Sequence, residues 1–437
     1  MRASIFNISA PFPETDEILL FNTSTGALIS VPSGVGDLVG RLTTPGGAIG
    51  DISPATLAEL TDLGFVLPDG ADEVGAVIER NRLGIADPNR LDVFILPNMN
   101  CNFACPYCYE EHAPSRLDEE TERRIISWFE TNAPNYKVVL LSWFGGEPLL
   151  SFETVLRIQR RVHEICRDAG VTFNSHITTN GYLLTPERAE ALCAADLLSY
   201  QITIDGPPDV HNVRRVLKGP GDSFERVFGN LCALARADSR ANIKLRVNFD
   251  ATTIERIPEL LEMVPKDIRP RLHPVLERLF DQGHLFIGKS PRWIAQKTEE
   301  AYDAARRLGF AVTTTPLVPE RLTYCYADRE SQVLFTHRGD VFKCTVSEFR
   351  PDQRLGFLDD DGRIVWEGTR HQDWMDVPAL DDDCMSCTYL PMCMGGCRKN
   401  RAESGHAGAD CTLPFAALDE RIRQRYAAQL ATSVQSA

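Results

Sequence analysis

The 437-residue sequence has no apolar run near the roughly 20 residues that a membrane-spanning helix needs. It also lacks the apolar stretch and small-residue cleavage site of an exported protein near its amino terminus. Basic residues are scarce, 46 against 61 acidic ones, and only Arg2 and Arg41 are basic among the first 75 residues. These absences predict a cytoplasmic protein with no membrane partner and no nucleic-acid partner, because nucleic acids require a basic surface.

Cysteine, by contrast, is plentiful, with 13 residues. In a reducing compartment this number is better explained by metal ligation than by disulfides. Cys166, Cys193 and Cys232 lie on predicted helices and are interpreted as buried apolar residues. The other ten fall into an amino-terminal group of three and a carboxy-terminal group of seven.

The first group consists of Cys101, Cys105 and Cys108 in the run CNFACPYCYE. This run follows an apolar strand and precedes a helix, in the kind of loop where α/β enzymes place their chemistry. A cuboidal four-iron cluster has four corners, so three thiolates leave one iron open for a substrate or cofactor. The alternatives are a zinc site, for which no partner pair of ligands follows nearby, and cysteines of the core.

A second motif, Phe144 to Pro148, ends the apolar run 138–144 with the residues FGGEP. The adjacent Gly145 and Gly146 let a backbone approach a ligand closely, and Glu147 can accept charge-assisted hydrogen bonds from an ammonium group. A plain strand-to-helix turn is the alternative interpretation.

The carboxy-terminal group contains a C-x2-C-x5-C-x3-C block, which is hard to obtain by chance. Its members are Cys325, Cys344, Cys384, Cys387, Cys393, Cys397 and Cys411. A zinc-knuckle fold is the alternative to further iron-sulfur centres.

Residues 91 to about 315 alternate strands and helices in the rhythm of a parallel βα sheet. Strands are predicted at 92–97, 138–144, 172–178, 199–204, 242–249 and about 270–275. Helices are predicted at 118–132, 152–169, 185–195, 223–236, 255–264 and 291–309. Both motifs follow strands of this sheet, at the edge where active sites of such sheets lie.

Together, the cysteine run with Tyr107 before its last cysteine, the GGEP motif and the cysteine array resemble radical S-adenosylmethionine (SAM) enzymes with a SPASM domain. The resemblance covers residues 91 to 411. It implies an α/β fold, with a partial (β/α)6 barrel over 91–315 and a SPASM iron-sulfur domain over 316–437. It also implies an oxidoreductase that uses SAM, one SAM-binding 4Fe-4S cluster and two auxiliary clusters.

The resemblance assigns roles to single residues. Cys101, Cys105 and Cys108 match the ligands of the SAM-binding cluster, and Glu147 matches the residue that binds the amino group of SAM. The other expected members of the SAM pocket are Tyr107, Gly145, Gly146, Asn180, Thr203 and Arg246. Of these, Arg246 could pair with the methionyl carboxylate.

The auxiliary clusters are assigned in the same way. In the resembled family, the second cluster takes the positions of Cys384, Cys387, Cys393 and Cys411. The first takes the positions of Cys325, Cys344 and Cys397. Some relatives, such as anaerobic sulfatase maturases, have an eighth cysteine upstream, whereas none lies here between Cys232 and Cys325. One hypothesis is that the open iron of the first cluster binds a substrate thiolate; a non-cysteine ligand is the alternative.

Residues 1–90 contain strand-like runs at 18–22 and 27–31, followed by helical patterns at 35–42 and 54–63. This order of two strands followed by helices is similar to the winged-helix element that binds leader peptides during ribosomal-peptide maturation. His211, Arg214 and Arg215 are predicted to lie in a loop where they could contact a peptide; the alternative is that they are simply solvated.

The expected function is therefore maturation of a ribosomally synthesised precursor peptide, with a flavodoxin or ferredoxin as electron donor. A missing eighth cysteine and a peptide-gripping domain favour thioether or carbon-carbon crosslinking. Sulfatase-type maturation, epimerisation and excision of a residue are alternatives. A non-catalytic iron-sulfur electron carrier is an alternative of another class.

Overall fold

The computed structural model describes the chain except for residues 13–14, 34–35, 51, 280–288, 313–321, 378–379, 381, 405–414, 416 and 436–437. The chain divides into two compact units. Unit 1 comprises residues 1–86, 314–329 and 376–437, and unit 2 comprises residues 87–313 and 330–375. One boundary of this division, between residues 313 and 314, lies close to the expected boundary at 316, but residues 330–375 belong to unit 2 with the barrel strands.

Unit 2 is built on a sheet whose strand order is β11-β10-β9-β8-β7-β6-β12-β13-β14-β15. Its parallel barrel strands are β6 (Arg90–Ile95), β7 (Val138–Trp143), β8 (Thr172–Thr179), β9 (Ser199–Thr203), β10 (Asn242–Phe249) and β11 (Leu272–Arg278). All six predicted strands are confirmed, with boundaries that differ by three residues or fewer.

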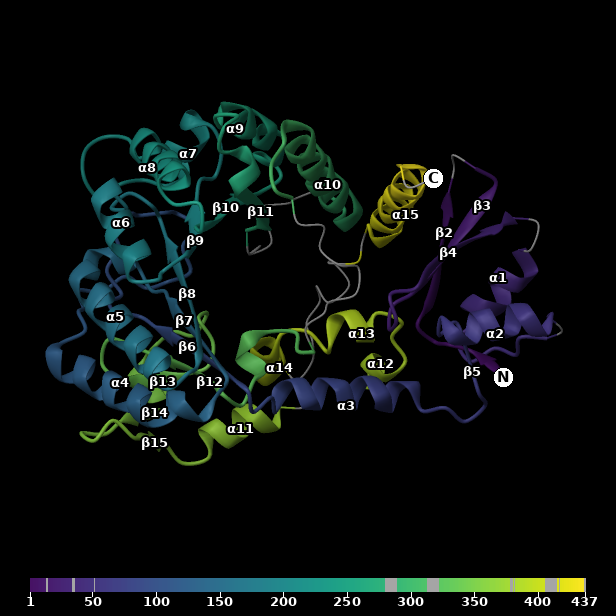
Figure 1. The fold of residues 1–437 in the computed structure, drawn as a ribbon, viewed down its shortest axis with the longest axis horizontal. Coiled ribbons are helices and arrows are strands. Elements are labelled where there is room, and N and C mark those ends of the chain that lie inside the picture. The colour runs from purple at the N-terminus through teal and green to yellow at the C-terminus, as the bar shows by residue number, and fades with distance from the viewer. Residues whose placement is uncertain are drawn as a thin grey trace. The chain divides into compact units, whose positions relative to one another are not determined.

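Helices follow the strands and lie along the outer side of the curved sheet (Figure 1). They are α4 (Glu119–Asn132), α5 (Phe152–Asp168), α6 (Pro186–Ala194), α7 (Pro208–Arg214), α8 (Phe224–Ala237), α9 (Ile257–Met263) and α10 (Pro291–Leu308). Local signals set their ends. Asp118 caps α4 by accepting from the Thr121 N–H at 2.8 Å, and Gly309 ends α10 in the left-handed region.

The core of unit 2 lies between the sheet and these helices. Alternate strand residues such as Ile177, Ile202 and Leu245 are fully buried there against helical residues such as Leu231 and Leu260. Because side chains alternate across a strand, the intervening residues face the inner side of the barrel. The inner side therefore carries the polar residues of the same strands.

An unpredicted extension continues this sheet beyond β6. Strand β12 (Gln332–Phe335) pairs parallel with β6, and β13 (Asp340–Phe342), β14 (Gly356–Leu358) and β15 (Ile364–Trp366) follow as antiparallel strands. Helix α11 (Arg370–Asp376) comes next. The strands are only three or four residues long, which gives too short a pattern for recognition from the sequence.

Unit 1 contains an antiparallel sheet of β2 (Asn7–Phe12), β3 (Glu17–Asn22) and β4 (Leu28–Pro32). A short pair, β1 (Arg2–Ala3) with β5 (Val66–Leu67), and helices α1 (Gly36–Thr43), α2 (Pro54–Asp62) and α3 (Glu73–Ile85) complete its amino-terminal part. The predicted strands at 18–22 and 27–31 and the predicted helices at 35–42 and 54–63 correspond to β3, β4, α1 and α2.

The carboxy-terminal part of unit 1 consists of α12 (Asp382–Met385), α13 (Leu390–Cys393), α14 (Arg398–Ser404) and α15 (Leu418–Gln435). Residues Leu418 and Ile422 of α15 pack on Leu19 and Phe21 of β3. The opposite face of β3 presents Leu20 to the core formed with α1 and α2. Burial on both faces explains why β3 is a continuous apolar run rather than an alternating one.

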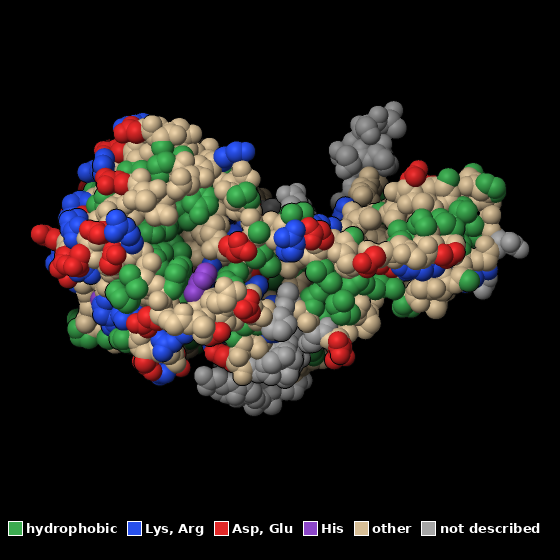
Figure 2. All heavy atoms as spheres, turned by 90° about the horizontal axis from the view of Figure 1, so that it is seen from below, with side chains coloured by type: hydrophobic (Ala, Val, Ile, Leu, Met, Phe, Trp, Pro, Cys, Tyr) green, Lys and Arg blue, Asp and Glu red, His purple; other side chains and the backbone are tan. Residues whose placement is uncertain are grey.

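The surface carries charged side chains of both signs (Figure 2), as expected from 46 basic and 61 acidic residues. On the face drawn in Figure 2, acidic side chains are interspersed with basic ones over the surface. Among the described residues, no helix has both the length and the apolar character needed to cross a membrane.

Candidate active site

The cysteine loop leaves β6 at its carboxyl end and is fixed to the segment that follows α7. Phe103, which is fully buried, forms an isolated bridge with Leu217. The Ala104 N–H donates to the Val216 carbonyl at 2.7 Å, and the Lys218 N–H donates to the Asn102 carbonyl at 2.8 Å. The loop is thus held by backbone pairing on both sides of Phe103.

The three cysteine side chains lie in different environments. Cys101 and Cys105 are half-buried, whereas Cys108 is exposed. Burial raises the pKa of Cys101 to about 12, and it also raises the pKa of Cys105. Thiolates at these two positions therefore require a cationic partner such as a metal.

These donors suit the cluster that the sequence predicts. Among the described residues, no three His, Cys, Asp or Glu side chains are close enough together to hold a single metal ion. In a four-iron cluster, each thiolate binds a separate iron, so the thiolates need not converge on one point. The donor chemistry of the loop, three thiol side chains, is that of a cluster with three cysteine ligands.

The GGEP turn lies directly against the cysteine loop. The Glu147 N–H donates to the Asn100 carbonyl at 2.7 Å. A Cβ atom added at Gly146 would lie 2.1 Å from the Asn100 oxygen, and one at Gly145 would lie 2.5 Å from the Asn98 oxygen. Gly145 also has φ +108, in the region that favours glycine. Both glycines are thus required by the close approach of the two backbones.

Replacing Gly146 by alanine is expected to lower the free energy of unfolding by about 3 kcal/mol or more, because the backbone of the cysteine loop must move. Denaturant unfolding measures this change. Gly229→Ala is the matched control, since a Cβ at this exposed position in α8 meets nothing within 4 Å. We expect the control to gain about 0.5–1 kcal/mol. Equal stabilities of the two variants would contradict the prediction.

Glu147 is fully buried and joins the turn to the end of β8. Its Oε1 accepts from the Leu149 N–H at 2.9 Å and from the Thr179 hydroxyl at 2.8 Å, and its Oε2 accepts from the Asn180 N–H at 2.7 Å. Burial raises the pKa of Glu147, while these donors act in the opposite direction. A carboxylate has about four acceptor positions, so Oε2 retains one for an ammonium group.

Asn180 connects Glu147 with the cysteine loop. Its side-chain Nδ2 donates to Asn102 Oδ1 at 2.8 Å and lies 3.9 Å from the Cys101 sulfur. Because its backbone N–H binds Glu147, a single residue contacts both motifs. The structure thus brings together Cys101, Glu147 and Asn180.

Tyr107 takes part in a buried network at the ends of β9 and β10. Its hydroxyl donates to Asp205 and accepts from Arg215 Nη1 at 2.9 Å. Asp205, in turn, accepts from the backbone N–H of Asn248 at 3.0 Å. The hydroxyl is therefore committed to protein partners, and the Arg214 guanidinium lies over the Tyr107 ring, 5.5 Å from its centroid.

The predicted loop position is wrong for His211 and Arg214 but right for Arg215, which follows directly after α7 and is buried there. His211 and Arg214 belong to α7, and His211 is fully buried against Phe224. Arg215 is only 8% exposed, and its Nη1 donates to the Tyr107 hydroxyl. Their polar character suggested exposure, but the charge of Arg215 is compensated by Asp205 inside the protein.

The two remaining pocket candidates lie side by side on the inner face of the barrel. Thr203 on β9 is the register partner of Arg246 on β10. The Arg246 Nε donates to Asn248 Oδ1 at 2.8 Å, which leaves its other N–H groups available. This arrangement would suit a carboxylate ligand.

Glu110 is a candidate that the sequence patterns did not reveal. Burial, followed by the nearby Glu147, raises the pKa of Glu110 to about 7. Two carboxyl groups so close together favour an ammonium ion between them. No motif marks Glu110, and only its position two residues after Cys108 could have suggested it.

The carboxy-terminal cysteines are divided between the units. Cys325, Cys384, Cys387, Cys393 and Cys397 belong to unit 1, whereas Cys344 belongs to unit 2. In the loop between α12 and α13, the Cys387 N–H donates to the Cys384 carbonyl at 3.1 Å. Cys411 lies outside the described residues.

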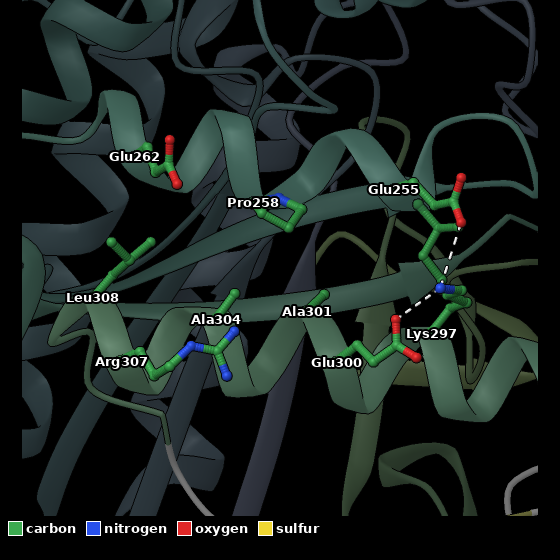
Figure 3. A pocket seen from close by; sticks show the side chains of 10 residues that line it. Glu255, Pro258, Glu262, Lys297, Glu300, Ala301, Ala304, Arg307 and Leu308 are labelled. Atoms are coloured by element: carbon green, nitrogen blue, oxygen red, sulfur yellow. Dashed lines mark hydrogen bonds and ion pairs between the residues drawn. The ribbon is translucent and has the colours of Figure 1, made fainter.

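A separate cavity of about 520 Å³ lies between α9 and α10, in the outer helical layer (Figure 3). There, the Lys297 ammonium lies 2.8 Å from Glu300 and 3.4 Å from Glu255. None of the cysteines or SAM-pocket candidates lines it. The cavity is therefore distinct from the candidate active site.

The sequence matches one protein-family profile and several related proteins. Residues 95–264 match the profile of the Radical SAM superfamily. Mycofactocin maturase MftC of Mycolicibacterium smegmatis is 25% identical over 314 residues, which cover 68% of this chain and 75% of that protein. An uncharacterized protein of Methanothermobacter thermautotrophicus is 31% identical over 197 residues, covering 43% of this chain and 68% of that protein.

Solved structures show the same fold. Native anSMEcpe with bound AdoMet and Cp18Cys peptide has a TM-score of 0.58 at 16% identity, covering 79% of this chain and 98% of that chain. Streptococcus suis SuiB bound to precursor peptide SuiA has a TM-score of 0.54 at 13% identity, and the match covers 94% of this chain and 99% of that chain. The cysteine loop follows β6 and the GGEP turn follows β7, as the sequence matches lead one to expect for this family. The family implies a 4Fe-4S cluster and SAM as cofactors. The chain therefore belongs to the radical SAM superfamily and is a radical SAM enzyme.

Proposed function

We propose that this enzyme oxidatively modifies a ribosomally synthesised precursor peptide, forming a thioether or carbon-carbon crosslink. The observation that carries the proposal is the bridge from Cys101 through Asn180 to Glu147, which makes one site of the two motifs. The peptide substrate is supported by the maturase MftC and by the peptides bound to SuiB and anSMEcpe.

Within this site, Cys101, Cys105 and Cys108 would hold the cluster. Glu147 would accept from the amino group of SAM, and the free N–H groups of Arg246 would bind its carboxylate. When bound, the cluster and SAM supply a 5'-deoxyadenosyl radical that abstracts a hydrogen atom from the peptide. The Tyr107, Asp205 and Arg215 network would keep the cysteine loop in register with β9 and β10.

The carboxy-terminal cysteines would bind two auxiliary iron-sulfur clusters. Cys384, Cys387, Cys393 and Cys411 would hold one auxiliary cluster, and Cys325, Cys344 and Cys397 the other. Such clusters provide a route for the second electron that an oxidised product loses, with a flavodoxin or ferredoxin as the external donor. The antiparallel sheet and helices of residues 1–90 would serve as a winged-helix-like element that binds a leader peptide.

Mass spectrometry of a short peptide encoded beside the gene, co-expressed with the enzyme, tests the function. A loss of about 2 Da per modification is expected for a crosslink, because two hydrogen atoms leave. An unchanged mass with deuterium uptake from solvent would indicate epimerisation instead. A peptide that remains unaltered in every respect would refute the proposal.

Cys384→Ala is expected to separate the two stages of the reaction. Because the first cluster retains its ligands, 5'-deoxyadenosine should still form, while modified peptide falls at least about tenfold and iron falls by about four atoms per chain. Chromatography of the nucleoside, mass spectrometry of the peptide and iron analysis measure the three quantities. Cys232→Ala, at a buried cysteine of α8, is the matched control. Full peptide modification by Cys384→Ala would rule out the role of this cysteine.

A further inference from the structure

One row of side chains crosses the inner face of the barrel below the SAM-pocket candidates. The strand register pairs Thr178 on β8 with Gln201 on β9, Gln201 with Lys244 on β10, and Lys244 with His273 on β11. We call these four residues the donor row. Each is half-buried.

The direction of these side chains follows from their neighbours. Ile177, Ile202, Leu245 and Leu272, which adjoin the donor row in their strands, are fully buried in the core under the helices. Successive side chains point to opposite faces of a strand, so the donor row faces the interior of the barrel. Its members are therefore placed to contact a molecule in that interior.

The donor row has an uncompensated charge. Within the described part of the chain, the Gln201, Lys244 and His273 side chains have no hydrogen-bond or ion-pair partner. Within the described strands β6 to β11, the inner-face carboxylates are Asp92, which pairs with Arg90 at 2.7 Å, and Glu277, at the exposed end of β11. Just beyond β9, Asp205 is bound by Tyr107 and Asn248. A half-buried ammonium group without a counter-charge is costly unless a ligand supplies one.

Among the described residues, Lys244 forms no ion pair, and the titratable side chain next to it is His176. His176, two residues before Thr178, lies 3.3 Å from the Thr178 hydroxyl and 3.1 Å from the Ser199 hydroxyl through its two ring nitrogens. Burial, followed by the charge of Lys244, lowers the pKa of His176 to about 4. His176 is therefore neutral near pH 7 and close to Lys244.

We infer that the donor row binds a carboxylate of the peptide substrate, either an acidic side chain or the carboxyl terminus, with Lys244 as its counter-charge. The inference rests on the proposed function and specifies its substrate class. The row lies two residues before Thr203 and Arg246 in the same strands, or about 7 Å deeper at ~3.3 Å per residue. The carbon atoms next to an anchored carboxylate would thus lie between the row and the SAM pocket, where the hydrogen atom is removed.

The test compares three enzymes on matched peptides: the unaltered enzyme, Lys244→Gln and the control Lys266→Gln, at an exposed lysine after α9. The peptides are the one encoded beside the gene, its carboxy-terminal amide, and versions with each Asp or Glu changed singly to Asn or Gln. KM for peptide and KM for SAM are measured separately. Iron content and the thermal midpoint show that each variant is folded and loaded.

In the unaltered enzyme and in Lys266→Gln, one of the amide substitutions is expected to raise the peptide KM about tenfold, as for loss of a charge-assisted hydrogen bond. In Lys244→Gln, the same substitution should change KM less than about twofold. The terminal amide and the side-chain amides identify which carboxylate is bound.

Three results would overturn the inference. In the first, the unaltered enzyme modifies every peptide with the same KM. In the second, Lys244→Gln keeps the full preference for the carboxylate. In the third, Lys244→Gln raises the KM for SAM alone, which assigns Lys244 to the SAM carboxylate. All three leave the proposed function intact, whereas SAM cleavage without modification of any peptide refutes that function together with the inference.

Discussion

Cys105→Ala will abolish SAM cleavage, lowering the rate of 5'-deoxyadenosine formation by at least about a thousandfold, because a four-iron cluster left with two protein ligands is not retained. Cys105 lies in the turn that the Cys108 N–H closes by donating to the Cys105 carbonyl at 3.0 Å. Alanine preserves this backbone bond and removes only the thiolate. The measurement is anaerobic incubation with SAM and reductant, followed by chromatography of the nucleoside.

Cys232→Ala is the control for this loss. Cys232 lies on α8, is 6% exposed and packs in the core of unit 2, and it comes more than 120 residues after the cysteine loop. We expect the control to keep its iron and its rate of nucleoside formation within about twofold. If Cys105→Ala formed 5'-deoxyadenosine at the rate of this control, the assignment of the SAM-binding cluster would be untenable.

Glu147→Gln has the second-largest expected effect. The amide oxygen can still accept from the Leu149 N–H and the Thr179 hydroxyl, but the amide NH2 then faces the Asn180 N–H, which is also a donor. An unsatisfied buried donor costs about 1–3 kcal/mol of unfolding free energy. Loss of the carboxylate should also raise the Kd for SAM about tenfold or more, because a charge-assisted hydrogen bond to its ammonium group disappears.

Two measurements separate the effects of Glu147→Gln. Denaturant unfolding reports the stability, and the SAM-induced change in the spectrum of the reduced cluster, titrated with SAM, reports the Kd. Glu190→Gln, at an exposed position of α6, removes the same charge without a buried partner and should leave both quantities unchanged. A destabilised Glu147→Gln with unaltered SAM affinity would show that Glu147 is a structural residue only.

The sequence predicted the barrel well because its elements carry long, regular signals. The run Val138 to Phe144 is apolar and is followed by two glycines, and Asp118 precedes a helix with acidic residues in its first turn. Such patterns depend on the nearest neighbours along the chain. The placement of the cysteine loop and GGEP after adjacent strands followed from the same regularity, and the hydrogen bond between Glu147 and Asn100 confirms that the two motifs meet.

Other features depended on contacts between distant residues. Strand β3 gains its second covered face from α15, nearly 400 residues later, where Leu418 and Ile422 pack with Leu19 and Phe21. The burial of Arg215 likewise depends on Tyr107 and Asp205, which come from other segments. No local pattern carries this information.

What the sequence by itself determined is the chemistry of the donors: three thiolates in one loop, two glycines before a carboxylate, and the strands that deliver them. The tertiary structure decided which donors share a site. Asn180 contacts both Cys101 and Glu147, and Lys244 faces the barrel interior beside Gln201 and His273 without an ion-pair partner among the residues that the structure describes. The physical reason is that residue type and local period are encoded along the chain, whereas charge compensation and strand register arise only when separate segments pack together.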